Sequence, residues 1–290
     1  MLGAAGIDVT EIVIEGRHGE IPARGYRGPA PAAGAALIWA HGGGFIGGDL
    51  DMPEAHWVAV ELARRGIPVL SIDYTKCVDG VHHPVPSDDV LDAWLFVAGH
   101  EDEFGVPEGQ LHFGGASAGA HLAAGVTKRL RDGAGPMPAS LVLAYPNLHS
   151  TPPPQSDALR AALTEGPLDF FTPAVMRDIN LNYAGSEAVF DDVYAYPGNG
   201  DVSGLPPVFV LNSERDSLRA SGERFGEQIA AAGGTVRVEY ESGTVHGHLN
   251  QPDDPAALRS IERMVDGCRS RRAPTVPSAR REAGPPHLFL

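Results

Sequence analysis

The segment Gly115-Ala116-Ser117-Ala118-Gly119 is the sequence feature that most constrains the fold of this chain. An apolar run at 111–113 precedes it, and a segment rich in alanine and leucine at 120–126 follows it. This order predicts a strand, a sharp turn and a helix, with Ser117 at the tip of the turn. Only small neighbours fit beside a serine in such a turn. Its hydroxyl would lie at a helix N-terminus, where the helix dipole favours a developing negative charge.

A second glycine-rich turn follows an earlier strand. The apolar run at 35–40 has the pattern of a strand buried on both faces, and it ends in His41-Gly42-Gly43-Gly44-Phe45. Consecutive glycines let backbone N–H groups point into a site without clashes from Cβ atoms. Such donors can stabilise a negatively charged oxygen in a reaction. Either turn alone is a weak signal, and the two together in this order are a much stronger one.

Strands and helices alternate along most of the chain. Two strand-like runs, Val9 to Ile14 and Ile21 to Tyr26, flank the turn at 16–19 and predict a hairpin at an antiparallel edge. Further strands are expected at 67–72, 140–145, 207–211 and 235–241, and further helices at 53–65, 86–99, after Ser117, up to about 232 and at 254–268. The alternation predicts an α/β fold, with a mostly parallel twisted sheet and helices on both faces.

One long segment interrupts this alternation. Residues 146–204 contain Pro152-Pro153-Pro154, several aromatic residues and one or two short helices, such as one at 173–183. A long excursion between sheet strands is typically a lid or binding segment. We therefore expect one catalytic domain at 1–268, with 146–204 as a small cap. The arginine- and proline-rich segment 269–290 lacks periodicity and is predicted to be a disordered tail.

Charge and cysteine content exclude several classes of partner. The formal net charge of −15 argues against nucleic acid and anionic membranes as partners. No run has membrane-spanning length, and no secretory signal is evident. Cys77 and Cys268 form neither a disulfide framework nor a metal-binding spacing, so we expect no metal, no cofactor and a reducing, cytoplasmic setting. The oligomeric state stays open, with a homodimer among the alternatives.

A serine hydroxyl becomes a good nucleophile when a histidine takes its proton and a carboxylate orients that histidine. Two acids follow the predicted strand at 207–211, and two histidines follow the one at 235–241. The candidates are Asp216 and Glu214 for the acid, and His246 and His248 for the base. Position along the chain does not decide within either pair.

The sequence resembles the hormone-sensitive-lipase-like branch of the α/β-hydrolase carboxylesterases, also called α/β-hydrolase fold-3, over residues 8–268. The motifs that carry the resemblance are His41-Gly42-Gly43-Gly44-Phe45, Asp73-Tyr74, the Gly115–Gly119 turn, Asp216-Ser217-Leu218-Arg219 and His246-Gly247. In the family the order is serine, acid, histidine; its aspartate opens Asp-Pro-Leu and its histidine opens His-Gly-Phe. The resemblance thus implies catalytic Ser117, Asp216 and His246, with oxyanion donors Gly43, Gly44 and Ala118.

The chain departs from the family pattern at three places near these motifs. Ala116 replaces the usual aspartate, Ser217 replaces proline and His248 replaces phenylalanine. None of these changes removes a catalytic group. Family members usually have one or two cap helices before the first strand, whereas few residues precede it here. We therefore expect that this half of the lid is missing or that the start is truncated.

The resemblance implies a serine hydrolase that cleaves short-to-medium-chain carboxylic esters through an acyl-enzyme intermediate. Its partner would be a small-molecule ester, and the chemistry requires no cofactor. One alternative is an arylformamidase-type amide or formamide hydrolase, because residues 117–122 also resemble those enzymes. A second is a non-catalytic binding protein, since the family includes plant hormone receptors that lost triad function. The intact serine, aspartate and histidine argue against this second alternative.

Overall fold

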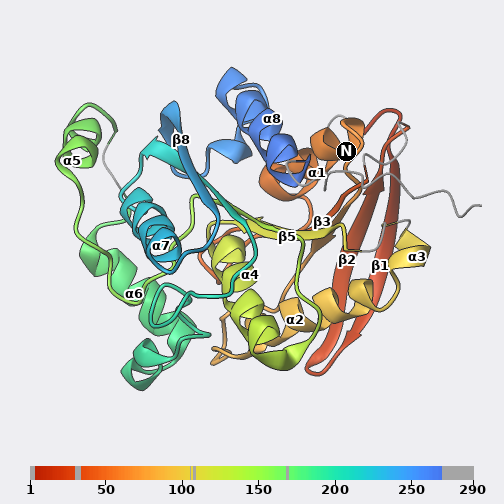
Figure 1. Ribbon diagram of the computed structural model, residues 1–290, viewed down its shortest axis with the longest axis horizontal. Helices are drawn as coiled ribbons and strands as arrows, with labels where there is room; N and C mark the ends of the chain where they lie inside the picture. The colour runs from red at the N-terminus through yellow and green to blue at the C-terminus, as the bar shows by residue number, and fades with distance from the viewer. Residues whose placement is uncertain (1–3, 30–33, 105, 107–108, 168–169, 270–290) are drawn as a thin grey trace, which may run out of the picture.

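A computed structural model of the chain describes residues 4–29, 34–104, 106, 109–167 and 170–269. An eight-stranded sheet in the order β1-β2-β4-β3-β5-β6-β7-β8 forms its centre (Figure 1). The strands are β1 (Asp8–Gly16), β2 (Gly19–Arg27), β3 (Ala36–Ala40), β4 (Val69–Ile72), β5 (Leu111–Ala116), β6 (Leu141–Ala144), β7 (Val208–Arg215) and β8 (Val236–Val245). The β1–β2 and β2–β4 pairs are antiparallel and the others parallel. The predicted α/β fold with a hairpin edge is confirmed.

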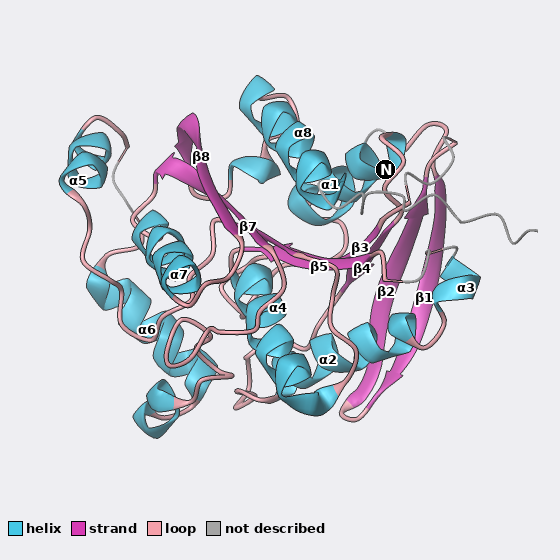
Figure 2. Ribbon diagram, viewed as in Figure 1, coloured by secondary structure: helices cyan, strands magenta, loops and turns pink. Residues whose placement is uncertain are grey.

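Helices cover both faces of the sheet, as Figure 2 shows. They are α1 (Pro53–Arg64), α2 (Val85–Ala98), α3 (Glu101–Phe104), α4 (Ala118–Arg129), α5 (Asp157–Thr164), α6 (Pro173–Ala184), α7 (Arg219–Ala231) and α8 (Pro255–Arg269). Helices α2, α4 and α7 pack on one face, and α1 and α8 pack on the other. The short helix α3 escaped prediction, and α5 lies in the segment where one or two short helices were expected without a position for this one. Helix α5 is only eight residues long, with Leu159 its one buried residue, and is too short for apolar periodicity to place it.

The sheet core has two apolar layers because parallel strands are covered on both sides. All five residues of β3 are buried. On the α2–α4 side, the ring of Trp94 packs 4.9 Å from that of Phe113, measured between centroids. Cys77 is buried in this layer and Cys268 in the opposite one.

Several element ends differ from the prediction, including those of β7, β8 and α8. Strand β7 continues from the expected end at Leu211 to Arg215, and β8 continues from Glu241 to Val245. Helix α8 runs to Arg269, the first residue of the segment predicted to be disordered. The rest of that segment, 270–290, lies outside the described residues.

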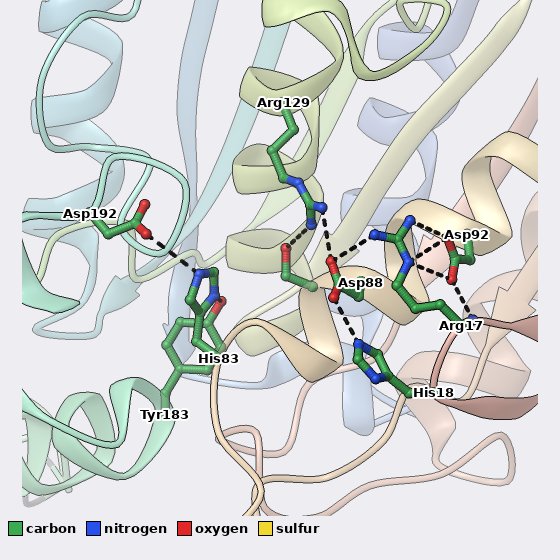
Figure 3. A network of polar contacts seen from close by, with 9 residues as sticks. Arg17, His18, His83, Asp88, Asp92, Arg129, Tyr183 and Asp192 are labelled. Carbon is green, nitrogen blue, oxygen red and sulfur yellow. Dashed lines mark hydrogen bonds and ion pairs between the residues drawn. The ribbon is translucent and has the colours of Figure 1, made fainter.

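A buried carboxylate ties the hairpin edge to two helices (Figure 3). Asp88 in α2 accepts hydrogen bonds from the His18 ring at 2.8 Å and from the Arg129 guanidinium of α4 at 2.8 Å. Arg17, in the turn between β1 and β2, contacts Asp88 at 3.3 Å and also bonds Asp92. These polar contacts fix the antiparallel edge to helices α2 and α4. The Asp88 residue at their centre is only 6% exposed.

We expect Asp88→Asn to lower the free energy of unfolding at pH 7 by about 2 kcal/mol, because it removes charge-assisted hydrogen bonds. Burial alone would raise the pKa of Asp88, but the hydrogen bonds from His18 and Arg129 and the Arg129 charge outweigh it, so the pKa lies below its usual value. A depressed pKa stabilises the fold above the unfolded-state value of about 3.9, and this stabilisation fades as pH falls through the folded-state pKa.

Urea unfolding curves at several pH values measure this effect, and Glu20→Gln, an exposed change in β2, is the control. The difference between wild type and Asp88→Asn should stay nearly constant between about pH 7 and 5 and shrink as the pH falls below about 4. An unchanged urea midpoint at pH 7 would show that the network does not stabilise the edge.

Candidate active site

Ser117 lies in a sharp turn between β5 and α4. Its backbone has φ 51° and ψ −115°, a strained conformation for a residue with a side chain. Close packing against β3 explains the small residues around it. A Cβ atom on Gly119 would lie 2.1 Å from the Ala40 carbonyl oxygen, and one on Gly115 would lie 2.6 Å from the same atom. Glycine is required at both positions if Ser117 is to hold this conformation.

The side chains of Ser117, His246 and Asp216 form a continuous line of hydrogen bonds. Ser117 Oγ lies 2.9 Å from His246 Nε2, and His246 Nδ1 lies 2.7 Å from Asp216 Oδ2. Asp216 is 1% exposed, and its other oxygen accepts the Leu218 amide at 3.0 Å. With a proton on Nδ1 directed to Asp216, Nε2 is left to accept the proton of the serine hydroxyl.

The two competing candidates lie elsewhere. The carboxylate of Glu214, still within β7, accepts a hydrogen bond from the Gly243 amide at 2.7 Å. His248 is 2% exposed and bonds two serine hydroxyls at 2.9 and 2.7 Å. Burial lowers the pKa of His248 to about 4, so its ring is neutral at pH 7. The structure thus brings Asp216 and His246 to the serine, and not these two residues.

The glycine-rich loop after β3 lies against the serine. A Cβ atom on Gly42 would be 3.2 Å from Ser117 Cβ. Gly43 and Gly44 have positive φ angles of 111° and 61°, which a residue without a side chain adopts easily. In the described part of the chain, no protein acceptor is bonded to the amides of Gly43, Gly44 or Ala118. These three N–H groups are free to bind an oxygen of a ligand.

A cavity of about 610 Å³ opens beside Ser117 and His246. Its wall is mostly apolar and includes side chains of the glycine-rich loop and of the excursion: Ile46, Met52, Phe171, Val175 and Ile179. The Phe171 ring packs edge-on against the His246 ring, with 4.5 Å between centroids. The Ser217 hydroxyl, at a position where the family has proline, donates to the Phe171 carbonyl at 2.9 Å. The excursion therefore forms part of the wall next to the histidine.

The loop before α2 holds the other end of α6 in place (Figure 3). The His83 amide donates to the Tyr183 carbonyl at 2.7 Å, and the His83 ring lies 3.1 Å from the Tyr183 hydroxyl. Tyr183 in turn stacks on Phe45 at 4.1 Å, so α6 packs directly on the end of the glycine-rich loop.

Sequence reasoning missed two residues of this site, Glu54 and Tyr145. Glu54 is in the first turn of α1 and lines the cavity, and Tyr145 directly follows β6. An acidic residue in the first turn of a helix is ordinary, because the helix dipole favours it, so Glu54 carried no special signal. Tyr145 ended an apolar run and resembled a core residue.

Other kinds of site are not evident in the described residues. No group of three or more histidine, cysteine or acidic residues there is arranged to hold a metal ion. Nor does that part of the chain contain a helix of the length and apolarity needed to cross a membrane.

The sheet order, the strand–serine–helix turn and the glycine-rich loop beside it define the α/β-hydrolase class. The sequence model of the alpha/beta hydrolase fold family matches residues 37–250. The chain belongs to this family, in its hormone-sensitive-lipase-like branch.

Several known esterases are similar to the chain. It is 36% identical to carboxylic ester hydrolase LipN of Mycobacterium tuberculosis over 256 residues, which cover 84% of this chain and 65% of LipN. It is 30% identical to esterase LipI of the same organism, covering 88% and 79%. The solved structure of the Pyrobaculum calidifontis esterase superposes with a TM-score of 0.80 at 30% identity, covering 91% and 85%. The match thus spans just under two thirds of LipN.

Proposed function

We propose that this protein is a carboxylic ester hydrolase with Ser117 as its nucleophile. The observation that carries the proposal is the line of hydrogen bonds from Ser117 Oγ through His246 to Asp216, at 2.9 and 2.7 Å. Similarity to LipN, LipI and the Pyrobaculum calidifontis esterase supports ester cleavage.

Acylation begins when Ser117 Oγ attacks the ester carbonyl carbon and its proton passes to His246 Nε2. Asp216 keeps the proton on Nδ1 and stabilises the imidazolium. The carbonyl oxygen becomes negatively charged and accepts hydrogen bonds from the amides of Gly43, Gly44 and Ala118. The bond to the alcohol oxygen then breaks, and the alcohol leaves with the proton from His246.

Deacylation repeats these steps with water. His246 takes a proton from the water as its oxygen attacks the acyl carbon, and the same backbone amides bind the second oxyanion. The acyl bond to Ser117 breaks, the carboxylic acid leaves, and the serine recovers its proton from His246. This chemistry needs no metal ion and no cofactor.

We also propose that 1–268 form one catalytic domain in which 146–204 act as a small cap. Support comes from Phe171, Val175 and Ile179, which line the cavity from within this segment. A reducing, cytoplasmic setting and a possible homodimer stay predictions.

Soluble esters with acyl chains of about two to eight carbons should be the best substrates, because each buried CH₂ contributes only about 0.8 kcal/mol and a finite apolar cavity soon fills. Long-chain triglyceride emulsions should be poor substrates, because the finite cavity cannot enclose a long acyl chain. The measurement is kcat/KM across a p-nitrophenyl ester series from acetate to palmitate. A maximum at palmitate, or a jump in rate above the solubility limit of the substrate, would contradict this prediction.

The amide-hydrolase alternative has a direct test. If kcat/KM for N-formylkynurenine exceeds that for p-nitrophenyl acetate and butyrate, the site is a formamide hydrolase with the same triad. We expect the esters to be preferred.

A further inference from the structure

A carboxylate without a cationic partner is buried beside the candidate nucleophile. Glu54 is 2% exposed, and none of the ion pairs among the described residues includes it. Its carboxylate accepts three hydrogen bonds: from the Gly42 amide at 2.6 Å, the Tyr145 hydroxyl at 2.7 Å and the Asn250 side-chain amide at 2.9 Å. A buried carboxylate is costly unless hydrogen bonds offset its loss of water, so these three contacts determine where Glu54 sits.

One oxygen of Glu54 holds the glycine-rich loop. Oε1 accepts the amide of Gly42, the residue directly before the proposed oxyanion donors Gly43 and Gly44. Gly43 and Gly44 adopt positive φ angles, and residues without a side chain can also adopt many other conformations. Oxyanion donors are effective only when they are fixed before the charge develops. A charge-assisted bond at Gly42 supplies that restraint.

The other oxygen of Glu54 reaches the histidine side of the site. Oε2 accepts the hydroxyl of Tyr145, whose ring packs edge-on against the His246 ring with 4.9 Å between centroids. It also accepts the side-chain amide of Asn250, and Asn250 Oδ1 accepts the Glu54 backbone amide at 3.1 Å. Asn250 belongs to the segment that follows His246. Glu54 thus joins the glycine-rich loop to Tyr145, which packs on the imidazole, and to the segment that follows His246.

We propose that Glu54 is a positioning residue that holds the oxyanion donors and the His246 ring in register with Ser117. This inference rests on the proposed function. Glu54 contacts no reacting atom itself. Through Gly42 and Tyr145 it positions the groups that act when the oxyanion forms, so its effect should fall on that step. Loss of Glu54 should therefore lower kcat and leave KM largely unchanged.

Glu54→Gln tests the proposal because the amide keeps the shape and loses one acceptor oxygen. If the amide oxygen faces Gly42, its NH₂ faces the Asn250 amide; if it is reversed, the Gly42 N–H loses its acceptor. We expect kcat for p-nitrophenyl butyrate to fall about 10- to 100-fold, less than for loss of an oxyanion donor, with KM within about 3-fold. Tyr145→Phe, which removes one hydrogen bond only, should give a smaller fall in kcat.

An alkyl trifluoromethyl ketone gives a second readout that a purely structural role would not move. Ser117 Oγ bonds to its carbonyl carbon, the hydroxyl proton moves to His246, and the carbonyl oxygen becomes an oxyanion. Its inhibition constant should rise in Glu54→Gln by the factor that kcat/KM falls. The control is Glu61→Gln, a buried glutamate of α1 that pairs with Arg64 and Arg65. It should leave kcat and the inhibition constant unchanged even if it lowers stability.

The proposal is overturned if Glu54→Gln leaves kcat within about 2-fold of wild type, if only KM changes, or if the ketone binds as tightly as before. Equal kcat losses in Glu61→Gln would also overturn it. Should Glu54→Gln not fold, Tyr145→Phe decides by the same two readouts. An active wild type with unchanged variants refutes this inference alone, whereas a wild type without esterase activity refutes the proposed function.

Discussion

Ser117→Ala should abolish turnover of p-nitrophenyl esters, with kcat reduced by about 10⁴-fold or more. The reason is that the reaction begins with attack by Ser117 Oγ, and the alanine leaves His246 without a hydroxyl to activate. The fold should be unaffected, because the backbone N–H of residue 117 still donates its hydrogen bond to the Ala144 carbonyl and the side chain is small. Initial rates with purified protein, together with thermal unfolding curves, measure both expectations.

Ser213→Ala is a matched control for Ser117→Ala. Ser213 is a buried serine whose hydroxyl bonds His248, outside the proposed triad. This variant should keep most of the activity even if it is less stable. If Ser117→Ala retains more than about a tenth of wild-type kcat, the nucleophile has been assigned to the wrong residue.

Asp216→Asn and His246→Ala should each reduce kcat by about 10³- to 10⁴-fold or more. His246→Ala removes the group that takes the proton from Ser117. Asp216→Asn replaces a carboxylate that accepts the Nδ1–H at 2.7 Å with a group that no longer stabilises the imidazolium. These two losses should not add to that of Ser117→Ala, because the three residues act as one unit.

Glu214→Gln and His248→Gln are the controls for this pair. Glu214 bonds the Gly243 amide and His248 bonds serine hydroxyls, so neither change should reduce kcat by more than about 10-fold. A reversed ranking within either pair would move the role of acid or base to the competing residue.

The sequence predicted the sheet, its hairpin edge and the strand–serine–helix turn because each depends on local patterns of apolar residues and glycines. The choice between Asp216 and Glu214 needed the resemblance, because the true end of β7 was not evident. That strand runs to Arg215, so Glu214 lies within it, at a register shift in the pairing with β8, and Asp216 is the first residue beyond the strand. Likewise β8 ends at Val245, so His246 directly follows the C-terminal end of this strand.

Long-range contacts account for what the sequence did not reveal. Glu54 and Tyr145 are 91 positions apart, and only the packing of α1 beside the end of β6 brings them together. The excursion was recognised, but its placement depends on Ser217 and His83, which bond it to distant loops. No local periodicity records such contacts.

The most direct test of the central claim, that Ser117 is the nucleophile, is covalent labelling with diethyl p-nitrophenyl phosphate. In this reaction a bond forms between the serine oxygen and phosphorus, and p-nitrophenolate leaves. Intact-protein mass spectrometry of the wild type should show one diethylphosphoryl group, peptide mapping should place it on Ser117, and labelling should parallel the loss of esterase activity. Modification of another residue, or full labelling of Ser117→Ala, would contradict the assignment.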